Sequence, residues 1–146
     1  MSGFEVTKTL AKVFSPLKRI PYLPIVIDEQ LKVITLFFRP QVFKVMIALV
    51  QYLKSLPEVK SKYHKYGGLE FLITEKEFCH IHGDGLIDIL LTRKVAERAI
   101  DRSRATQHHV IKNSGWVSYQ LKGKDDIEEV KLLVLEAMKL RKGDNV

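Results

Sequence analysis

Features of secreted, membrane-spanning and disulfide-stabilised proteins are nearly absent from this sequence of 146 residues. Cys79 is the only cysteine, so no internal disulfide can form, and a lone thiol fits a reducing cytosol. The N-terminus lacks the basic and apolar regions of a signal peptide. The longest charge-free apolar run, 45–53, is far too short to span a membrane. We therefore predict a cytoplasmic protein with no transmembrane segment.

Motifs for nucleotides and nucleic acids are also missing: there is no glycine-rich phosphate loop, zinc finger or RNA-binding signature. The net charge of +7 is nevertheless uneven, because residues 1–66 carry eleven Lys and Arg against four Asp and Glu, whereas 67–146 carry thirteen of each. Such a surplus can mark a surface for nucleic acid or an acidic partner, although it is more often a solvated face. The candidates for a nucleic-acid surface are Lys54, Lys60, Lys62 and Lys65.

The N-terminal half is predicted to be mostly helical. Apolar residues recur at helical spacing over 4–17 and again over 40–55. Between these segments, 20–38 holds β-branched and aromatic runs that fit either two strands or pieces of helix. Residues 57–66 form a polar, basic connection, in which His64 is expected to be exposed.

The C-terminal half changes from helical to alternating periodicity after Gly67 and Gly68. The predicted elements are strands near 69–73, 77–82 and 86–91 joined by turns at 74–76 and 83–85, a helix over 93–104, a loop over 105–115, a strand over 116–121 and a helix from 125 to 142. Hairpins followed by helices indicate an α+β fold, an antiparallel sheet of β-β-β-α-β-α order with helices largely on one face. The length fits a single domain over 1–146.

Turn length decides which side chains meet on this sheet, because side chains alternate between its faces. A three-residue turn at 83–85 makes His80 face Asp88 and places Cys79 among aliphatic residues on the core face. A three-residue turn at 74–76 would likewise place Glu70 opposite His80. The result is a predicted row of Glu70, His80 and Asp88 across three strands, with His82 one step along.

Carboxylates on both sides of His80 would raise its affinity for a proton and fix its ring. That arrangement suits acid–base chemistry, a small polar ligand or a divalent metal such as zinc. Two histidines of the 105–115 loop could supply a further ligand or base. The candidate residues are therefore Glu70, His80, His82, Asp88, His108 and His109. The alternative is a polar face whose charged groups pair with one another and bind nothing.

Several short motifs occur in a fixed order between residues 67 and 121. They are Gly67-Gly68-Leu69-Glu70-Phe71, Glu77-Phe78-Cys79-His80-Ile81-His82, Gly85-Leu86-Ile87-Asp88 with Leu91, His108 or His109, and Trp116-Val117-Ser118-Tyr119. In this order and spacing the chain resembles the luciferase-like domain family of bacteria, archaea and fungi, over residues of about 67–140. The resemblance supplies residues and no reaction. We therefore predict a luciferase-like domain that binds a small polar ligand or divalent metal, with enzymatic activity and homo-oligomerisation left open.

Overall fold

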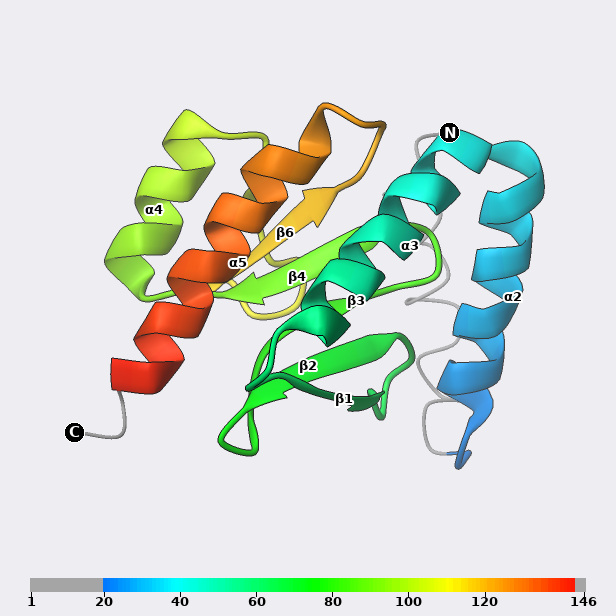
Figure 1. Ribbon diagram of the computed structural model, residues 1–146, viewed down its shortest axis with the longest axis horizontal. Helices are drawn as coiled ribbons and strands as arrows, with labels where there is room; N and C mark the ends of the chain where they lie inside the picture. Colours follow the sequence, from blue (N-terminus) through cyan, green and yellow to red (C-terminus); the bar gives the residue numbers. More distant parts are fainter. Residues whose placement is uncertain (1–19, 144–146) are drawn as a thin grey trace.

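A computed structural model describes residues 20–143, so the helix predicted over 4–17 lies outside the described residues. Six antiparallel strands form one sheet in the order β1-β2-β3-β4-β6-β5. The described elements are α2 (Leu23–Phe38), α3 (Pro40–Ser55), β1 (Lys60–Tyr63), β2 (Leu69–Ile73), β3 (Lys76–Ile81), β4 (Leu86–Leu90), α4 (Arg93–Arg102), β5 (Thr106–Gln107), β6 (Trp116–Gln120) and α5 (Asp126–Gly143). Helices α3, α4 and α5 lie in front of the sheet, and α2 lies beside α3 (Figure 1). The predicted α+β fold is confirmed.

Three segments differ from the sequence prediction or decide between its alternatives. Within residues 20–38, for which strands and helix were both open, Leu23–Phe38 form α2, which has Pro24 in its first turn. The predicted connection 57–66 contains β1, whose four residues are all exposed. The predicted loop 105–115 begins with the two residues of β5. Both missed strands lie at the edges of the sheet, where side chains need no apolar alternation.

The core lies between the sheet and the helices in front of it. Helix α3 contributes five buried residues, Val42, Val45, Met46, Leu49 and Leu53. Helix α5 contributes the apolar Val130, Val134, Ala137 and Met138. The predicted core face is confirmed, because Cys79, Ile81, Ile87, Ile89 and Leu91 are all buried in this cluster. Burial raises the pKa of the Cys79 thiol, which fits an inert apolar role. Among the described helices, none is long and apolar enough to cross a bilayer.

The turn between β2 and β3 is shorter than predicted. Residues Thr74 and Glu75 form a two-residue turn, and Ile73 pairs directly with Lys76. Both turn residues have positive φ, 50° and 63°, as a type I′ hairpin turn requires. The prediction of a three-residue turn at 74–76 is therefore wrong.

A β-bulge next to this turn restores the predicted register at the site. Phe78 is the extra residue, because its neighbours Glu77 and Cys79 pair with consecutive residues of β2. Beyond the bulge, Glu70 faces His80 as predicted. The bulge also changes which face Glu77 occupies, since regular alternation would have placed Glu77 on the core side with Cys79.

Helix α2 packs closely against a glycine of the β3–β4 turn. A Cβ at Gly83 would lie 2.2 Å from the carbonyl oxygen of Asp28 and 2.8 Å from the amide nitrogen of Lys32. We expect Gly83→Ala to lower the free energy of unfolding by about 1–3 kcal/mol, because α2 must shift to admit the methyl group. Urea unfolding of this variant and of Gly123→Ala measures the effect. Gly123 has nothing within 4 Å of its added Cβ. Equal losses of unfolding free energy in the two variants would therefore contradict the close packing of α2 against Gly83.

Candidate metal centre

The face of the sheet opposite the core carries one polar row that crosses all six strands. The predicted pairs of Glu70 with His80 and of His80 with Asp88 are both present. The pairings of the outer strands extend the row to Lys62 on one side and to Ser118 and Thr106 on the other. The register of the sheet therefore brings these side chains together, because they do not form a local sequence motif.

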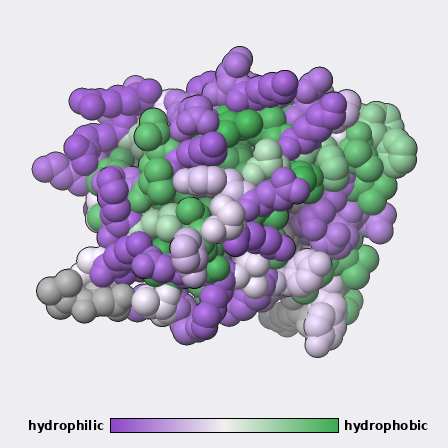
Figure 2. Space-filling view, viewed as in Figure 1, coloured by the Kyte–Doolittle hydropathy of each residue, from purple (hydrophilic) through white to green (hydrophobic). Residues whose placement is uncertain are grey.

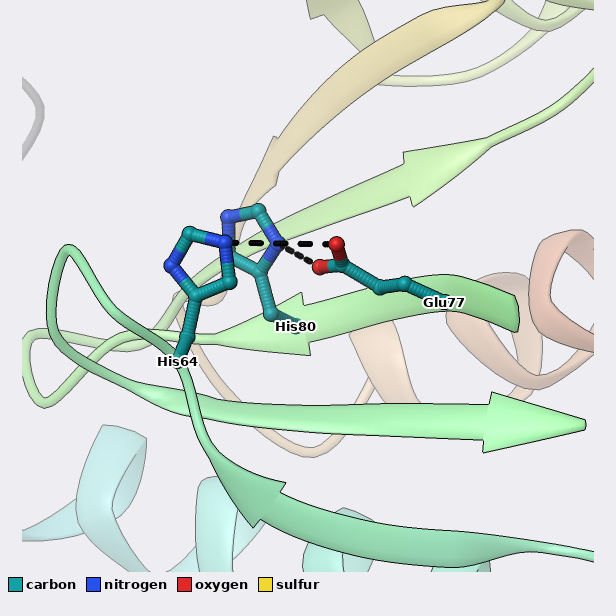
Figure 3. Close-up of side chains that lie close together, drawn as sticks. All are labelled: His64, Glu77 and His80. Atoms are coloured by element: carbon teal, nitrogen blue, oxygen red, sulfur yellow. Dashed lines mark hydrogen bonds and ion pairs between the residues drawn. The ribbon is translucent and has the colours of Figure 1, made fainter. Parts of the chain in front are cut away.

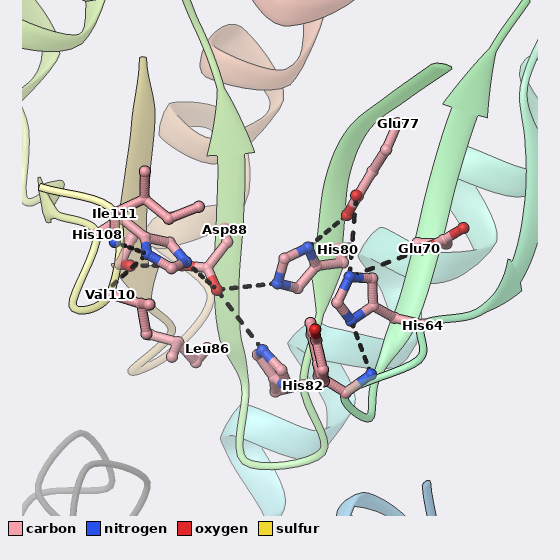
Figure 4. Close-up of polar contacts among 12 residues, drawn as sticks. His64, Glu70, Glu77, His80, His82, Leu86, Asp88, His108, Val110 and Ile111 are labelled. Atoms are coloured by element: carbon pink, nitrogen blue, oxygen red, sulfur yellow. Dashed lines mark hydrogen bonds and ion pairs between the residues drawn. The ribbon is translucent and has the colours of Figure 1, made fainter. Parts of the chain in front are cut away.

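Asp88 lies at the centre of the site and is fully buried. Its Oδ1 accepts a hydrogen bond from the Ser118 hydroxyl. Its Oδ2 is approached by the Nε2 atoms of three histidines, at 3.0 Å from His80, 3.6 Å from His82 and 3.5 Å from His108. Figure 4 shows His80 and His82 on one side of this carboxylate and His108 on the other.

The other ring nitrogen of His80 and of His82 meets a carboxylate. His80 Nδ1 lies 2.6 Å from Glu77 Oε1, and His82 Nδ1 lies 3.3 Å from Asp28 Oδ1. Each Nδ1 therefore carries a proton that it donates to the carboxylate, because an ionised carboxylate only accepts. When such a ring is neutral, its Nε2 holds a lone pair that is aimed at Asp88. This is the orientation that histidine ligands of metals adopt in proteins.

His108 has the opposite arrangement. Its Nδ1 accepts hydrogen bonds from the backbone N–H groups of Val110 and Ile111, both at 3.1 Å. A nitrogen that accepts cannot carry a proton, so the ring proton lies on Nε2 and points at Asp88. His108 is therefore a hydrogen-bond donor to the Asp88 carboxylate, whereas His80 and His82 are suited to bind an ion.

The pKa values follow from this crowding around one buried carboxylate. Burial lowers the pKa of His82, but the hydrogen bonds to Asp28 and Asp88 outweigh burial and raise it to about 10. In His80, too, the hydrogen bonds to Asp88 and Glu77 outweigh burial and raise the pKa. Burial raises the pKa of Asp88, but the hydrogen bonds from the three histidines hold it well below its usual range. With a pKa of about 10, His82 is cationic near neutral pH when no metal is present, and the raised pKa of His80 favours its protonated form.

His64 extends the site, contrary to the prediction that it is exposed. Its side chain is 13% exposed and its ring stacks on that of His80, with centroids 4.5 Å apart. Its Nε2 lies 3.9 Å from Oε2 of Glu77 (Figure 3). Burial and the charge of His80 lower the pKa of His64 to about 4, so this ring is neutral at pH 7. The prediction failed because flanking lysines made the segment look solvated.

Two groups of described residues have ligand atoms close enough to share an ion. One comprises His80, His82 and Asp88, and the other comprises His64, Glu77 and His80; within each group the atoms lie within 4.8 Å of one another. Two ligands about 2.0–2.2 Å from a tetrahedral ion are about 3.3–3.6 Å apart. The distances from Asp88 Oδ2 to the two Nε2 atoms are 3.0 Å, slightly below this range, and 3.6 Å, at its upper end. The first group therefore fits an ion with small side-chain adjustments.

The remaining predicted candidates lie outside this group. Glu70 is on the polar row, but its carboxylate pairs with Lys62 at 3.1 Å. His109 stacks on His108, with ring centroids 4.7 Å apart. Sequence analysis did not select Asp28 or Glu77 as site residues. Glu77 had a signal in the motif E-x-x-H, whereas Asp28 had none beyond being an acidic residue within an apolar run.

The lysines predicted for nucleic acid are spread over α3, β1 and the loop that follows β1. Lys62 pairs with Glu70, and Lys60 forms an ion pair with Glu75. Lys65 lies over the ring of Tyr66, and Lys54 is in the last turn of α3. The nucleic-acid surface stays a prediction.

Residues 75–137 match the model of the Luciferase domain family. Over this segment the chain is similar to the luciferase-like domain family. The matched segment runs from the β2–β3 turn into α5, and includes His80, His82, Asp88 and His108. Asp28, His64 and Glu70 lie before it. A search of curated proteins finds none that matches this chain.

Proposed function

We propose that this luciferase-like domain binds one divalent transition-metal ion through Nε2 of His80, Nε2 of His82 and Oδ2 of Asp88. The observation that carries the proposal is the pairing of both Nδ1 atoms with carboxylates. Each of the two histidines donates its Nδ1–H to a carboxylate, so that its Nε2 lone pair can reach the ion. A polar face whose groups merely neutralise one another does not require this shared orientation.

The ligand set favours a particular class of ion. Two imidazoles and one carboxylate suit zinc or ferrous iron, whereas calcium and magnesium prefer all-oxygen ligands. Three protein ligands leave at least one coordination position open. A small polar ligand or water would occupy that position, where the ion would act as a Lewis acid.

The protein groups around the ion have separate tasks. Glu77 and Asp28 hold the two imidazole rings and increase their basicity. His108 donates its Nε2–H to Asp88, and Ser118 donates to the other oxygen of the same carboxylate. Asp88 Oδ2 is fully buried and is the atom that His80, His82 and His108 approach, so it is the oxygen that gains most from an ion.

The test is metal binding by the purified full chain. We expect about one zinc or iron ion per chain by elemental analysis, and isothermal titration of chelator-treated protein should give one site. His80→Ala removes a ligand and should weaken binding at least about 100-fold. His109→Ala is the matched control, because it removes an adjacent histidine that is outside the group and should leave affinity nearly unchanged.

A second pair of variants separates a metal site from a closed ion-pair network. Glu77→Gln weakens the acceptor for His80 Nδ1–H and should reduce affinity about 10–100-fold. Glu75→Gln, two residues away in the exposed turn, should have no effect. Metal-free protein that takes up no ion, or equal uptake by His80→Ala and wild type, would exclude the proposed function.

A further inference from the structure

Helix α2 exposes an apolar stripe on the side that faces away from the domain. Tyr22 at its N-cap is 77% exposed, Val26 52%, Val33 49% and Phe37 74%. In Figure 2 apolar side chains are visible along the edge of the molecule that α2 occupies. Single exposed apolar residues are ordinary, but four along one side of a helix mark an interaction surface.

The inward side of α2 packs against the domain. Asp28 and Thr35, the two buried residues of the helix, face the domain. Asp28 accepts a hydrogen bond from the backbone N–H of Gly83 at 2.9 Å and also binds His82. At about 100° per residue, the stripe lies on the opposite side of the helix from these two residues. The described residues therefore leave the outer side of α2 uncovered.

The spacing of the stripe is symmetric. Its residues follow one another at intervals of four, seven and four, with an aromatic residue at each end and a valine next to each. The order reads the same from either end, aromatic, valine, valine, aromatic. When two such helices pack antiparallel about a two-fold axis, Tyr22 of one copy meets Phe37 of the other, and Val26 meets Val33.

We infer that a second copy of this chain covers the stripe, so that the protein forms a two-fold symmetric dimer through antiparallel packing of α2. A two-fold interface uses the same patch on both subunits, and a patch with palindromic spacing is complementary to itself. The axis passes between Glu29 and Gln30, which places the carboxylate of each copy opposite the amide of the other. This polar centre favours the antiparallel register over a parallel one, in which the two carboxylates would face each other.

The charge of α2 favours a second copy over a lipid surface. Interfacial helices carry Lys and Arg on the flanks of the apolar side. Within α2 the charged residues are Asp28, Glu29 and Lys32, and the lysine forms an ion pair with Glu29. An anionic bilayer therefore gains little from this helix.

The surface that is available predicts a weak dimer. Each of the four aromatic rings, two per copy, offers roughly 150–250 Å² for burial. Together with the valines, one pair of helices stays near or below about 1,200 Å², the lower end of specific interfaces. We expect a dissociation constant in the range of about 1–100 µM, with dimers favoured at high salt because both copies are basic.

Cysteine cross-linking of the full chain tests the register. Val26→Cys and Val33→Cys are prepared separately; native Cys79 is fully buried and should not interfere. A mixture of the two variants should oxidise to a disulfide-linked dimer, because residues 26 and 33 of different copies face each other. Either variant alone should cross-link poorly, since identical positions lie about 10 Å apart along the axis, beyond the roughly 7 Å Cα separation that a disulfide allows.

Sedimentation of wild type and Phe37→Ser completes the test. Wild type should pass from monomer to dimer between about 1 µM and 1 mM, whereas Phe37→Ser should remain monomeric over that range. Equal melting temperatures of the two proteins exclude unfolding as the cause. Wild type that stays monomeric at every concentration, equal cross-linking by each single variant, or binding to anionic vesicles without self-association would overturn the inference.

Discussion

Asp88→Asn is expected to abolish metal binding and to lower the free energy of unfolding of the metal-free protein by about 3–5 kcal/mol. Asp88 is fully buried and is the shared partner of His80, His82 and His108. Without its negative charge, the protonated forms of His80 and His82 lose the carboxylate that they share and keep only Glu77 and Asp28 as partners. Removing one partner of a buried ion pair is costly because the other charge stays desolvated.

Urea unfolding at pH 7 with a chelator present measures the loss of stability, and titration with zinc measures the loss of affinity. Asp125→Asn is the matched control, because Asp125 is exposed and the same chemical change should alter stability by less than about 0.5 kcal/mol. Should Asp88→Asn unfold like wild type, His80 and His82 would have to be neutral in the metal-free protein. The raised pKa values of His80 and His82 argue against that outcome.

The register of the site was predictable because it depends on local features of the hairpins. The turn at 83–85 holds His82 opposite Leu86, as the predicted three-residue turn requires. The alternation of Cys79 and the aliphatic residues with the histidines then assigned the two faces. At the β2–β3 hairpin the predicted pairing of Glu70 with His80 is correct, although the predicted turn length is wrong. A two-residue turn plus a bulge gives the same offset beyond the bulge as a three-residue turn.

Two contributors to the site were not predictable, because each depends on packing across long sequence distances. Asp28 reaches His82 only because α2 packs against the turn at Gly83, and nothing near residue 28 indicates that packing. His64 meets His80 only because β1 forms an edge strand beside β2. Glu77 is the intermediate case: its motif was visible, but its face was set by the bulge.

The different roles of the histidines could also be assigned only from the structure. Sequence analysis grouped four histidines as equivalent candidates. Their roles differ because of the partner of the second ring nitrogen, which is a carboxylate for His80 and His82 and two backbone N–H groups for His108. Residue type and spacing do not encode that partner, whereas it decides whether Nε2 offers a lone pair or a proton.

The stability of the metal-free protein should be greatest near pH 6.5 and should fall on both sides. The pKa of His82 is raised from 6.5 to about 10 by Asp28 and Asp88, which outweigh its burial. Because the folded state binds this proton more tightly than the unfolded state, the stabilisation is complete below pH 6.5 and is lost as pH rises through about 10. His64 acts in the opposite sense, since burial lowers its pKa from 6.5 to about 4. Its contribution is present above pH 6.5 and is lost as pH falls through about 4.

Urea unfolding between about pH 4 and pH 10 with a chelator present measures both sides of this profile. His82→Gln should flatten the alkaline side and leave the acid side unchanged, whereas His64→Gln should do the reverse. Zinc affinity should rise with pH over the alkaline range, because the ion must displace the Nε2 protons of His80 and His82. An alkaline side that is as steep in His82→Gln as in wild type would show that the Asp28–His82–Asp88 contacts do not hold the proton, and zinc affinity that is independent of pH would place the ion on other ligands.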